Sequence, residues 1–351
     1  MAYRKIMFKI LFAAILFAPA KALSAGGSAE ESFNPGTFIL DHIGDGYDWH
    51  VLTFKGHHVS VPLPIILYSK QSGLHVFMSC KFHHGHSSDK GFSIAADGPH
   101  KGKIVEQATG ARPALDLSIT KNVFALFVSV GFIIWVFLSV AKAYKRRSNQ
   151  APKGLQSWLE PVILFVRDDI ARPAIGHNYK RFMPYLLTVF FFILINNLMG
   201  LIPIFPFGAN VTGNIAITLV LAIFTFLITM GSSSKTYWVH IFNTPGVPWW
   251  LKIPLPLMPF VEVLGVFIKP FVLMIRLFAN ITAGHIIAIG FFSLIFIFGE
   301  MHVAMGFGAS VISVLFTVFM TFLELLVAFI QAYVFTLLSA LYFGMAVEEH
   351  H

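Results

Sequence analysis

Long apolar runs separated by short polar segments dominate this chain from about residue 122 to its end. The first run, Asn122 to Ala141, has about 20 residues, enough to cross a ~30 Å hydrocarbon core as a helix. Two further runs, Phe182 to Ile204 and Val211 to Met230, have similar lengths, and an uncharged segment rich in Pro and Phe joins them. The pattern predicts three membrane helices in this part of the chain.

The last two apolar stretches, about Phe260 to Phe298 and Met305 to Ala346, are the longest. Each has about 40 residues and would reach ~60 Å as a helix, roughly twice the hydrocarbon thickness, so each must be strongly tilted or broken. A segment rich in Pro and Trp, Thr244 to Pro259, precedes them, and Phe298 to Gly308 is expected to turn on the exported side. We therefore expect an all-α polytopic membrane protein with about five membrane helices, the last two long and tilted.

The segment Leu155 to Gly176 interleaves apolar and charged residues. As a helix it would place two groups on different flanks: Trp158, Val162, Phe165 and Val166 on one, and Arg167, Asp168 and Asp169 on the other. This separation predicts an amphipathic helix along the cytoplasmic membrane surface. An ordinary cytoplasmic loop helix is the alternative.

The first 25 residues have a basic start, a short apolar core and small residues near their end. This order is typical of a cleaved secretory signal peptide, and the apolar core is too short to cross a membrane. An uncleaved anchor is the alternative, and under either interpretation the residues that follow are exported.

Residues 26–118 are polar and rich in Gly, Pro and His. Alternating apolar and polar positions in Trp49 to Ser69 and in His75 to Phe82 predict a small strand-rich exported domain. Cys80 is the only cysteine, which excludes an intrachain disulfide. Three histidines lie close to it in sequence: His83, His84 and His86. They could bind a metal, but no second ligand set accompanies them, so a solvated loop is favoured.

Composition and charge agree with a membrane domain over residues 119–351. The chain is 56% hydrophobic and 12% charged, against roughly 25% charged in soluble domains. Lys142, Lys145, Arg146 and Arg147 follow the first span directly, which places its carboxyl end in the cytoplasm. No GxxxxGK[ST] motif is present, so nucleotide chemistry is not expected on this chain.

Arg276 is the most informative residue, because it lies within an apolar helix. A guanidinium does not readily lose its proton and costs at least ~2.5 kcal/mol near mid-bilayer, so it is a functional candidate. At 100° per residue, Glu262, Lys269 and Asn280 share its stripe, whereas His285 points about 180° away.

The last helix carries Glu324 and Gln331 on nearly one face. In an antiparallel hairpin, residues at one depth have a constant sum of residue numbers. Arg276 with Gln331 gives about 607 and His285 with Glu324 gives about 609, and half of each sum falls in the expected turn. The spacing thus predicts that each pair lies level. Polar residues that only join helices are the alternative.

Ile268 to His285, together with Phe329 to His350, resembles subunit a of the rotary F-type ATP synthase. The motif R-L-F-x-N followed by Q-A-[YF]-[VIF]-F is highly specific, and the resemblance extends from about Leu155 to the end. The first 120 residues are longer than the family's usual start. Ala279 stands where the motif often has Gly, and the acid and histidine are exchanged relative to some bacterial members.

The resemblance implies a stator subunit that conducts protons and couples their flow to rotation of a c-subunit ring. The implied roles are Arg276 facing the ring, His285 and Glu324 in the inlet half-channel, Asn280 and Gln331 beside the arginine, and Glu262 in the outlet half-channel. Implied partners are the c-ring, b-type peripheral stalk subunits and the lipid bilayer. The ion, H⁺ or Na⁺, depends on the ring.

The same resemblance implies a multi-pass protein of the bacterial inner membrane, with a periplasmic amino-terminal domain and a cytoplasmic carboxyl terminus. We expect no cofactor, metal or nucleic acid, and no enzymatic activity from the chain alone. Two other classes were considered: a self-contained proton-coupled secondary transporter, which should show an inverted repeat, and a receptor or scaffold, which leaves the buried arginine unexplained.

Overall fold

The computed structural model describes residues 43–54, 57–70, 72–85, 87–95, 98–146, 151–202, 207–242 and 257–348, with positions 35, 36 and 39. The description below concerns the unit Thr37–His351. The signal peptide predicted for residues 1–25 and most of the segment rich in Pro and Trp lie outside the described residues, as do the side chains of the histidine group.

The amino-terminal part is built from short antiparallel strands, as the alternating pattern predicts. They are β1 (Asp48–Phe54), β2 (His57–Pro62), β3 (Pro64–Ser69), β4 (Gly73–Met78), β5 (Phe92–Ile94), β6 (Ile104–Glu106) and β7 (Leu115–Asp116). β1 pairs with β2, β5 pairs with β6, and β3 is central in a sheet of order β4-β3-β7. The strand predicted over His75 to Phe82 ends earlier, at Met78, because a 3-10 helix, η1 (Ser79–Gly85), follows it.

One face of the β4-β3-β7 sheet forms the core of this part. Ile65 and Leu67 of β3 are fully buried, and Phe77 of β4 packs edge-on against Phe82. Phe92 from the β5–β6 hairpin belongs to the same cluster, so that hairpin covers this face. The alternation of strand side chains leaves the other face of the sheet uncovered by this core.

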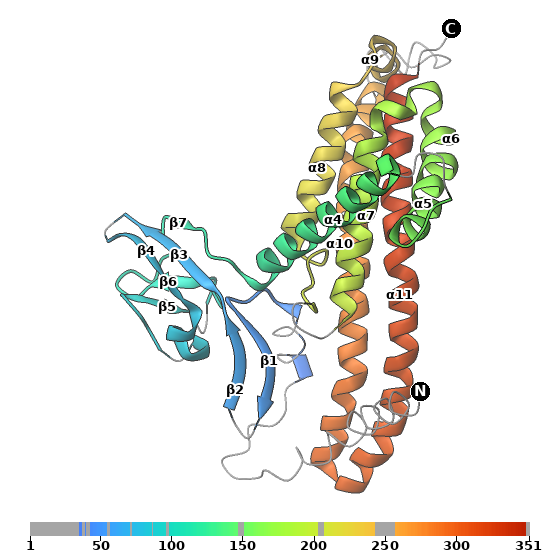
Figure 1. The fold of residues 1–351 in the computed structure, drawn as a ribbon. Helices are drawn as coiled ribbons and strands as arrows, with labels where there is room; N and C mark the ends of the chain where they lie inside the picture. The colour runs from blue at the N-terminus through green and yellow to red at the C-terminus, as the bar shows by residue number, and fades with distance from the viewer. Residues whose placement is uncertain are drawn as a thin grey trace. The chain divides into compact units, whose positions relative to one another are not determined.

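Helices dominate the described residues from Lys121 onward (Figure 1). They are α4 (Lys121–Arg146), α5 (Leu155–Phe165), α6 (Arg172–Ile175), α7 (Tyr179–Leu201), α8 (Ile215–Gly231), α9 (Lys235–Phe242), α10 (Leu257–Met301) and α11 (Val303–Val347). In the described part of the chain, four helical segments are long and apolar enough to cross a membrane. The number is five if α8 and α9, bent by 101°, count as one span. This agrees with the predicted polytopic fold.

The predicted amphipathic segment is helical but not a single regular helix. A π-helical turn, η2 (Val166–Ala171), follows α5, and a 3-10 turn, η3 (Gly176–Asn178), links α6 to α7. The buried stripe is Val166, Ile170, Ala171 and Ile175. Trp158, predicted on the apolar flank, is 83% exposed, so it does not pack in the protein core, and its position against the membrane surface stays a prediction. A π turn winds more residues than an α turn, and it therefore shifts the buried face after residue 166.

α10 and α11 run antiparallel along their length, and α7 packs beside α11 (Figure 1). Each has 45 residues, or about 68 Å at 1.5 Å per residue, and neither is broken. Only His302 separates them, so the turn is much shorter than the predicted Phe298 to Gly308. Gly306 allows this, because an added Cβ there would lie 2.8 Å from the Gly299 Cα. We call this the turn end of the hairpin, and the other the C-terminal end.

α7 and α11 are held together by aromatic packing. Phe182 stacks on Phe343 with ring centroids 4.8 Å apart, and Phe190 and Phe335 are fully buried in the same cluster. Gly344 lies where α11 crosses α6, since an added Cβ would collide with the Ala174 carbonyl oxygen. These contacts fix α11 at its C-terminal end.

Candidate functional site

The polar stripe predicted on α10 lies on an uninterrupted helix. Glu262, Lys269 and Arg276 are seven residues apart and therefore point in nearly one direction. Glu262 and Lys269 are partly buried, whereas Arg276 is exposed. Leu273 and Leu277 flank the arginine in sequence and are buried in the helical core. The core thus holds α10 with the arginine directed outward.

Arg276 makes no hydrogen bond or ion pair with any residue that the structure describes. Exposed apolar residues surround it on α10, including Phe271, Val272 and Ile275. A permanent cation on an apolar helix surface requires an anionic or polar group from outside the chain.

Asn280 and Gln331 join α10 to α11 next to the arginine. Nδ2 of Asn280 donates a 2.9 Å hydrogen bond to Oε1 of Gln331, whose side chain is 2% exposed. The sum of residue numbers predicts that Gln331 lies level with Arg276. In the structure Gln331 instead contacts Asn280, one helical turn away on α10. The amide pair therefore fixes the separation of the helices beside the arginine.

His285 and Glu324 lie level on the two helices, as the number sum predicts. His285 Nδ1 is 3.9 Å from Glu324 Oε1, and both side chains are mostly buried, at 19% and 12% exposed. Oε1 of Glu324 has no hydrogen-bond partner among the described residues. A buried carboxylate oxygen without a donor is an energetically expensive arrangement, typical of a functional group.

Two glycines that the sequence analysis did not single out lie beside this pair, and one of them, Gly284, leaves the space that the Glu324 carboxylate occupies. An added Cβ on Gly284 would lie 2.7 Å from Oε1 of Glu324, and one on Gly200 of α7 would lie 3.7 Å from Nε2 of His285. Glycine carries no polar signal, so its role becomes visible only through the contact. The pair is thus enclosed by α7, α10 and α11.

Arg276 and His285 point to different sides of α10, as the helix geometry predicts. Arg276 is exposed on α10, whereas His285 is mostly buried toward α11. Asn280 also reaches α11, although it is about 140° from His285 around the helix. Both flanks of α10 therefore contact α11, and the arginine points away from the histidine–carboxylate pair.

Four asparagines lie in α7 and in the segment before α8. Two of them make structural hydrogen bonds, and the other two each have a side-chain atom that the described residues leave unpaired. Nδ2 of Asn197 donates to the Ala328 carbonyl at 3.2 Å, its Oδ1 accepts from Thr212 at 2.6 Å, and Asn214 caps α8. Oδ1 of Asn196 and Nδ2 of Asn210 have no partner among the described residues. Asn197 joins α7 to α11 one turn from Glu324.

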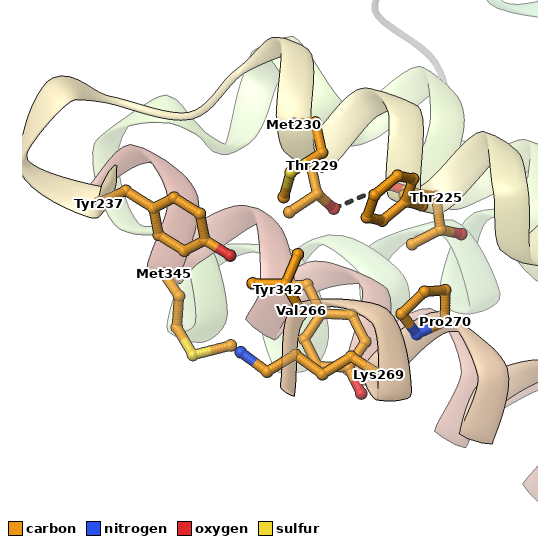
Figure 2. A pocket seen from close by; sticks show the side chains of 10 residues that line it. Thr225, Thr229, Met230, Tyr237, Val266, Lys269, Pro270, Tyr342 and Met345 are labelled. Carbon is orange, nitrogen blue, oxygen red and sulfur yellow. Dashed lines mark hydrogen bonds between the residues drawn. The ribbon is translucent and has the colours of Figure 1, made fainter. Parts of the chain in front are cut away.

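A small pocket opens at the C-terminal end of the hairpin, between α8, α9, α10 and α11 (Figure 2). Figure 2 shows the Lys269 ammonium directed toward Met345, beside Tyr237. The Lys269 Nζ lies 5.6 Å from the ring centroid of Tyr342, a cation–π contact. Glu262 is within electrostatic range of both Lys269 and Tyr237. Acid, ammonium and two phenols thus gather at this end.

Comparisons with known proteins agree with this geometry. The family model described as ATP synthase A chain matches residues 123–344, and a model described as a domain of unknown function (DUF8433) matches residues 38–123. An ATP synthase subunit a from Chloroherpeton thalassium is 44% identical over 244 residues, covering 67% of this chain and 69% of its own. An ATP synthase subunit a 2 from Chlorobaculum tepidum is 47% identical over 240 residues, covering 67% and 64%.

The similarity to one relative also includes the amino-terminal part. An ATP synthase subunit a from an Anaeromyxobacter species is 34% identical over 345 residues, which covers 95% of this chain and 75% of that protein. The strand-rich region is therefore shared with another protein of that name.

Proposed function

This chain belongs to the ATP synthase A chain family, and from that premise we propose that it is the stator subunit that couples proton flow to rotation of a c-subunit ring. The observation that carries the proposal is the position of Arg276. Its guanidinium is exposed on an apolar helix and makes no hydrogen bond or ion pair with the described residues, while polar pairs join the two helices of the hairpin beside it.

Arg276 supplies the fixed positive charge opposite the ring. A ring carboxylate enters lipid only when neutral, because a charged one is too costly there. When it reaches Arg276 the ionised form is favoured, so the proton is released. The same charge opposes direct proton flow from one half-channel to the other.

His285 and Glu324 form the inlet half-channel, through which protons reach the ring carboxylate. Both groups bind and release protons, and at 3.9 Å they are too far apart to lock one proton in a direct hydrogen bond. The oxygens of Asn196 and Thr282, which have no hydrogen-bond partner among the described residues, add acceptors on α7 and α10. Asn280 and Gln331 keep α10 and α11 in register between this pair and the arginine.

Glu262 serves the outlet half-channel at the C-terminal end. It lies two seven-residue repeats, or about four helical turns, before Arg276 on the same stripe. A proton released at Arg276 therefore meets Glu262 on the way out. Lys269, between them, adds a positive charge held against the Tyr342 ring.

The basic residues at the end of α4, Lys145 and Arg146, support a cytoplasmic position for that end. The strand-rich domain is then periplasmic, and the C-terminal end of the hairpin faces the cytoplasm. The partners are the c-ring, b-type stalk subunits and lipid, while nucleotide chemistry belongs to other subunits.

Purification of the tagged chain from its native membrane in mild detergent tests this function. We expect c subunits and stalk subunits to co-purify, and ATP addition to the reconstituted complex to acidify the vesicle lumen. A chain that purifies alone and moves protons or a solute without a ring would overturn the proposal.

A further inference from the structure

The outer face of the β4-β3-β7 sheet is a grid of nine apolar side chains. The strand register places Tyr68 opposite both Leu74 and Leu115, and Ile66 opposite Val76. Backbone hydrogen bonds from Leu117 N to Ile66 O and from Ile119 N to Pro64 O extend the pairing beyond β7. Three rows cross the sheet: Leu74–Tyr68–Leu115, Val76–Ile66–Leu117 and Met78–Pro64–Ile119.

The grid is open and contains no charged residue. Leu74 and Leu117 are each 65% exposed, and Val76 is 55% exposed. The buried core lies on the opposite face, where Ile65 and Leu67 point. Contiguous exposed apolar patches of this kind mark interaction sites rather than ordinary surface.

The grid is joined to the membrane-spanning helix α4 by a very short connection. Ile119 lies two residues before Lys121, the first residue of α4, and Lys121 N donates to the Gly46 carbonyl. The backbone N–H of Asn122 donates to Oδ1 of Asp45, which is a second link between the start of α4 and the strand-rich part. At ~3.4 Å per residue, Leu115 lies at most ~20 Å from the start of α4.

We propose that this grid lies on the bilayer leaflet at the amino-terminal end of α4, so that its ligand is lipid. The row nearest the helix ends at Ile119, two residues before α4, and α4 itself exposes apolar side chains such as Phe127, which is 63% exposed. The farthest row carries Tyr68, and exposed Lys70 follows in the turn just after β3. An aromatic and a lysine at the rim are typical of contact with headgroups.

A second copy of the chain fits this face less well. Stable protein interfaces use roughly 20–30 residues a side, more than twice the size of this grid. Contact with lipid needs no such area, because α4 already holds the sheet at the membrane and supplies a high effective concentration.

Depth-dependent quenching of a single fluorophore tests the proposal. The full-length chain with Cys80→Ser and Val76→Cys is labelled with an environment-sensitive dye and reconstituted into phosphatidylcholine–phosphatidylglycerol vesicles. A nitroxide is attached near the top of the acyl chains, since an interfacial face enters roughly 5–10 Å. The matched control is Lys101→Cys, an exposed position in the turn of the β5–β6 hairpin, which covers the other face.

We expect strong nitroxide quenching and blue-shifted emission at position 76, and neither at position 101. Adding Leu117→Glu should reduce quenching at position 76, whereas Thr109→Glu, also exposed, should not. Equal quenching at the two positions would overturn the proposal. A blue shift without quenching, or cross-links between two copies through position 76, would do the same, because protein would then cover the grid.

Discussion

His285 Nδ1 and Glu324 Oε1 lie 3.9 Å apart across the α10–α11 hairpin, beyond hydrogen-bond distance yet within ion-pair range. The two side chains are therefore coupled electrostatically, while each keeps an atom that can exchange a proton with a third group. Such an arrangement suits groups that pass protons on rather than hold them.

Glu324→Gln should slow ATP-driven proton pumping in inverted vesicles by about a hundredfold or more, since a glutamine cannot take up and release the proton. The matched control is Glu300→Gln, near the turn end of α10 and exposed, which should leave pumping close to normal. Equal losses in the two variants would contradict the assignment of Glu324 to the inlet half-channel.

Arg276→Ala should abolish ATP-driven pumping while the protein remains in the membrane at normal amounts. Its side chain is exposed and makes no hydrogen bond or ion pair in the described part of the chain, so we expect stability to change by only about 0.5 kcal/mol or less. Arg172→Ala provides a control, because Arg172 is also exposed but pairs with Asp168 in α6 and η2. Normal coupling in the Arg276 variant would refute its role opposite the ring.

Gly284→Ala should slow pumping, because the new Cβ would lie 2.7 Å from Oε1 of Glu324 and must displace the carboxylate. Gly290→Ala, on the same helix, meets nothing within 4 Å and should pump normally. Alanine is favoured over glycine in a helix by up to ~1 kcal/mol, so neither loss of helix nor of protein is expected. If both variants pump at the same rate, space around the carboxylate is not limiting.

Gly344→Ala should destabilise the protein by about 1–3 kcal/mol, because the added methyl group collides with the Ala174 carbonyl and forces α11 away from α6. Thermal unfolding in detergent measures this directly. Gly308→Ala is the matched control on α11, since it faces open space. An unchanged melting temperature for Gly344→Ala would mean that the α6–α11 contact adapts easily.

Much of the hairpin could be predicted from helix geometry alone. The level pairing of His285 with Glu324 needed only the rise per residue and the position of the turn. The partner of Gln331 was missed by one turn, because side chains lean toward the amino terminus of their helix and number sums ignore that direction. For residues in contact across the hairpin, the sum of the two residue numbers is therefore not constant. It ranges from about 605 for Gly299 with Gly306 to about 611 for Asn280 with Gln331.

Other features had no signal in the sequence pattern. The π turn at Val166 shifts the buried face of the residues that follow it, and a hydrophobicity pattern that assumes 3.6 residues per turn does not detect such a change. Gly284 gains its importance from the Glu324 side chain that approaches it. The apolar grid on the β4-β3-β7 sheet required the strand register, which depends on pairing between distant segments.

With only His302 between two 45-residue helices, α10 and α11 cannot slide independently. A shift of one helix large enough to separate His285 from Glu324 would also break the Asn280–Gln331 bond and the contact of Gly299 with Gly306. The depth of each titratable group is thereby set by the connection at the far end of the hairpin. An exchange of the acid and the histidine between the two helices would therefore leave both groups at the same height in the membrane.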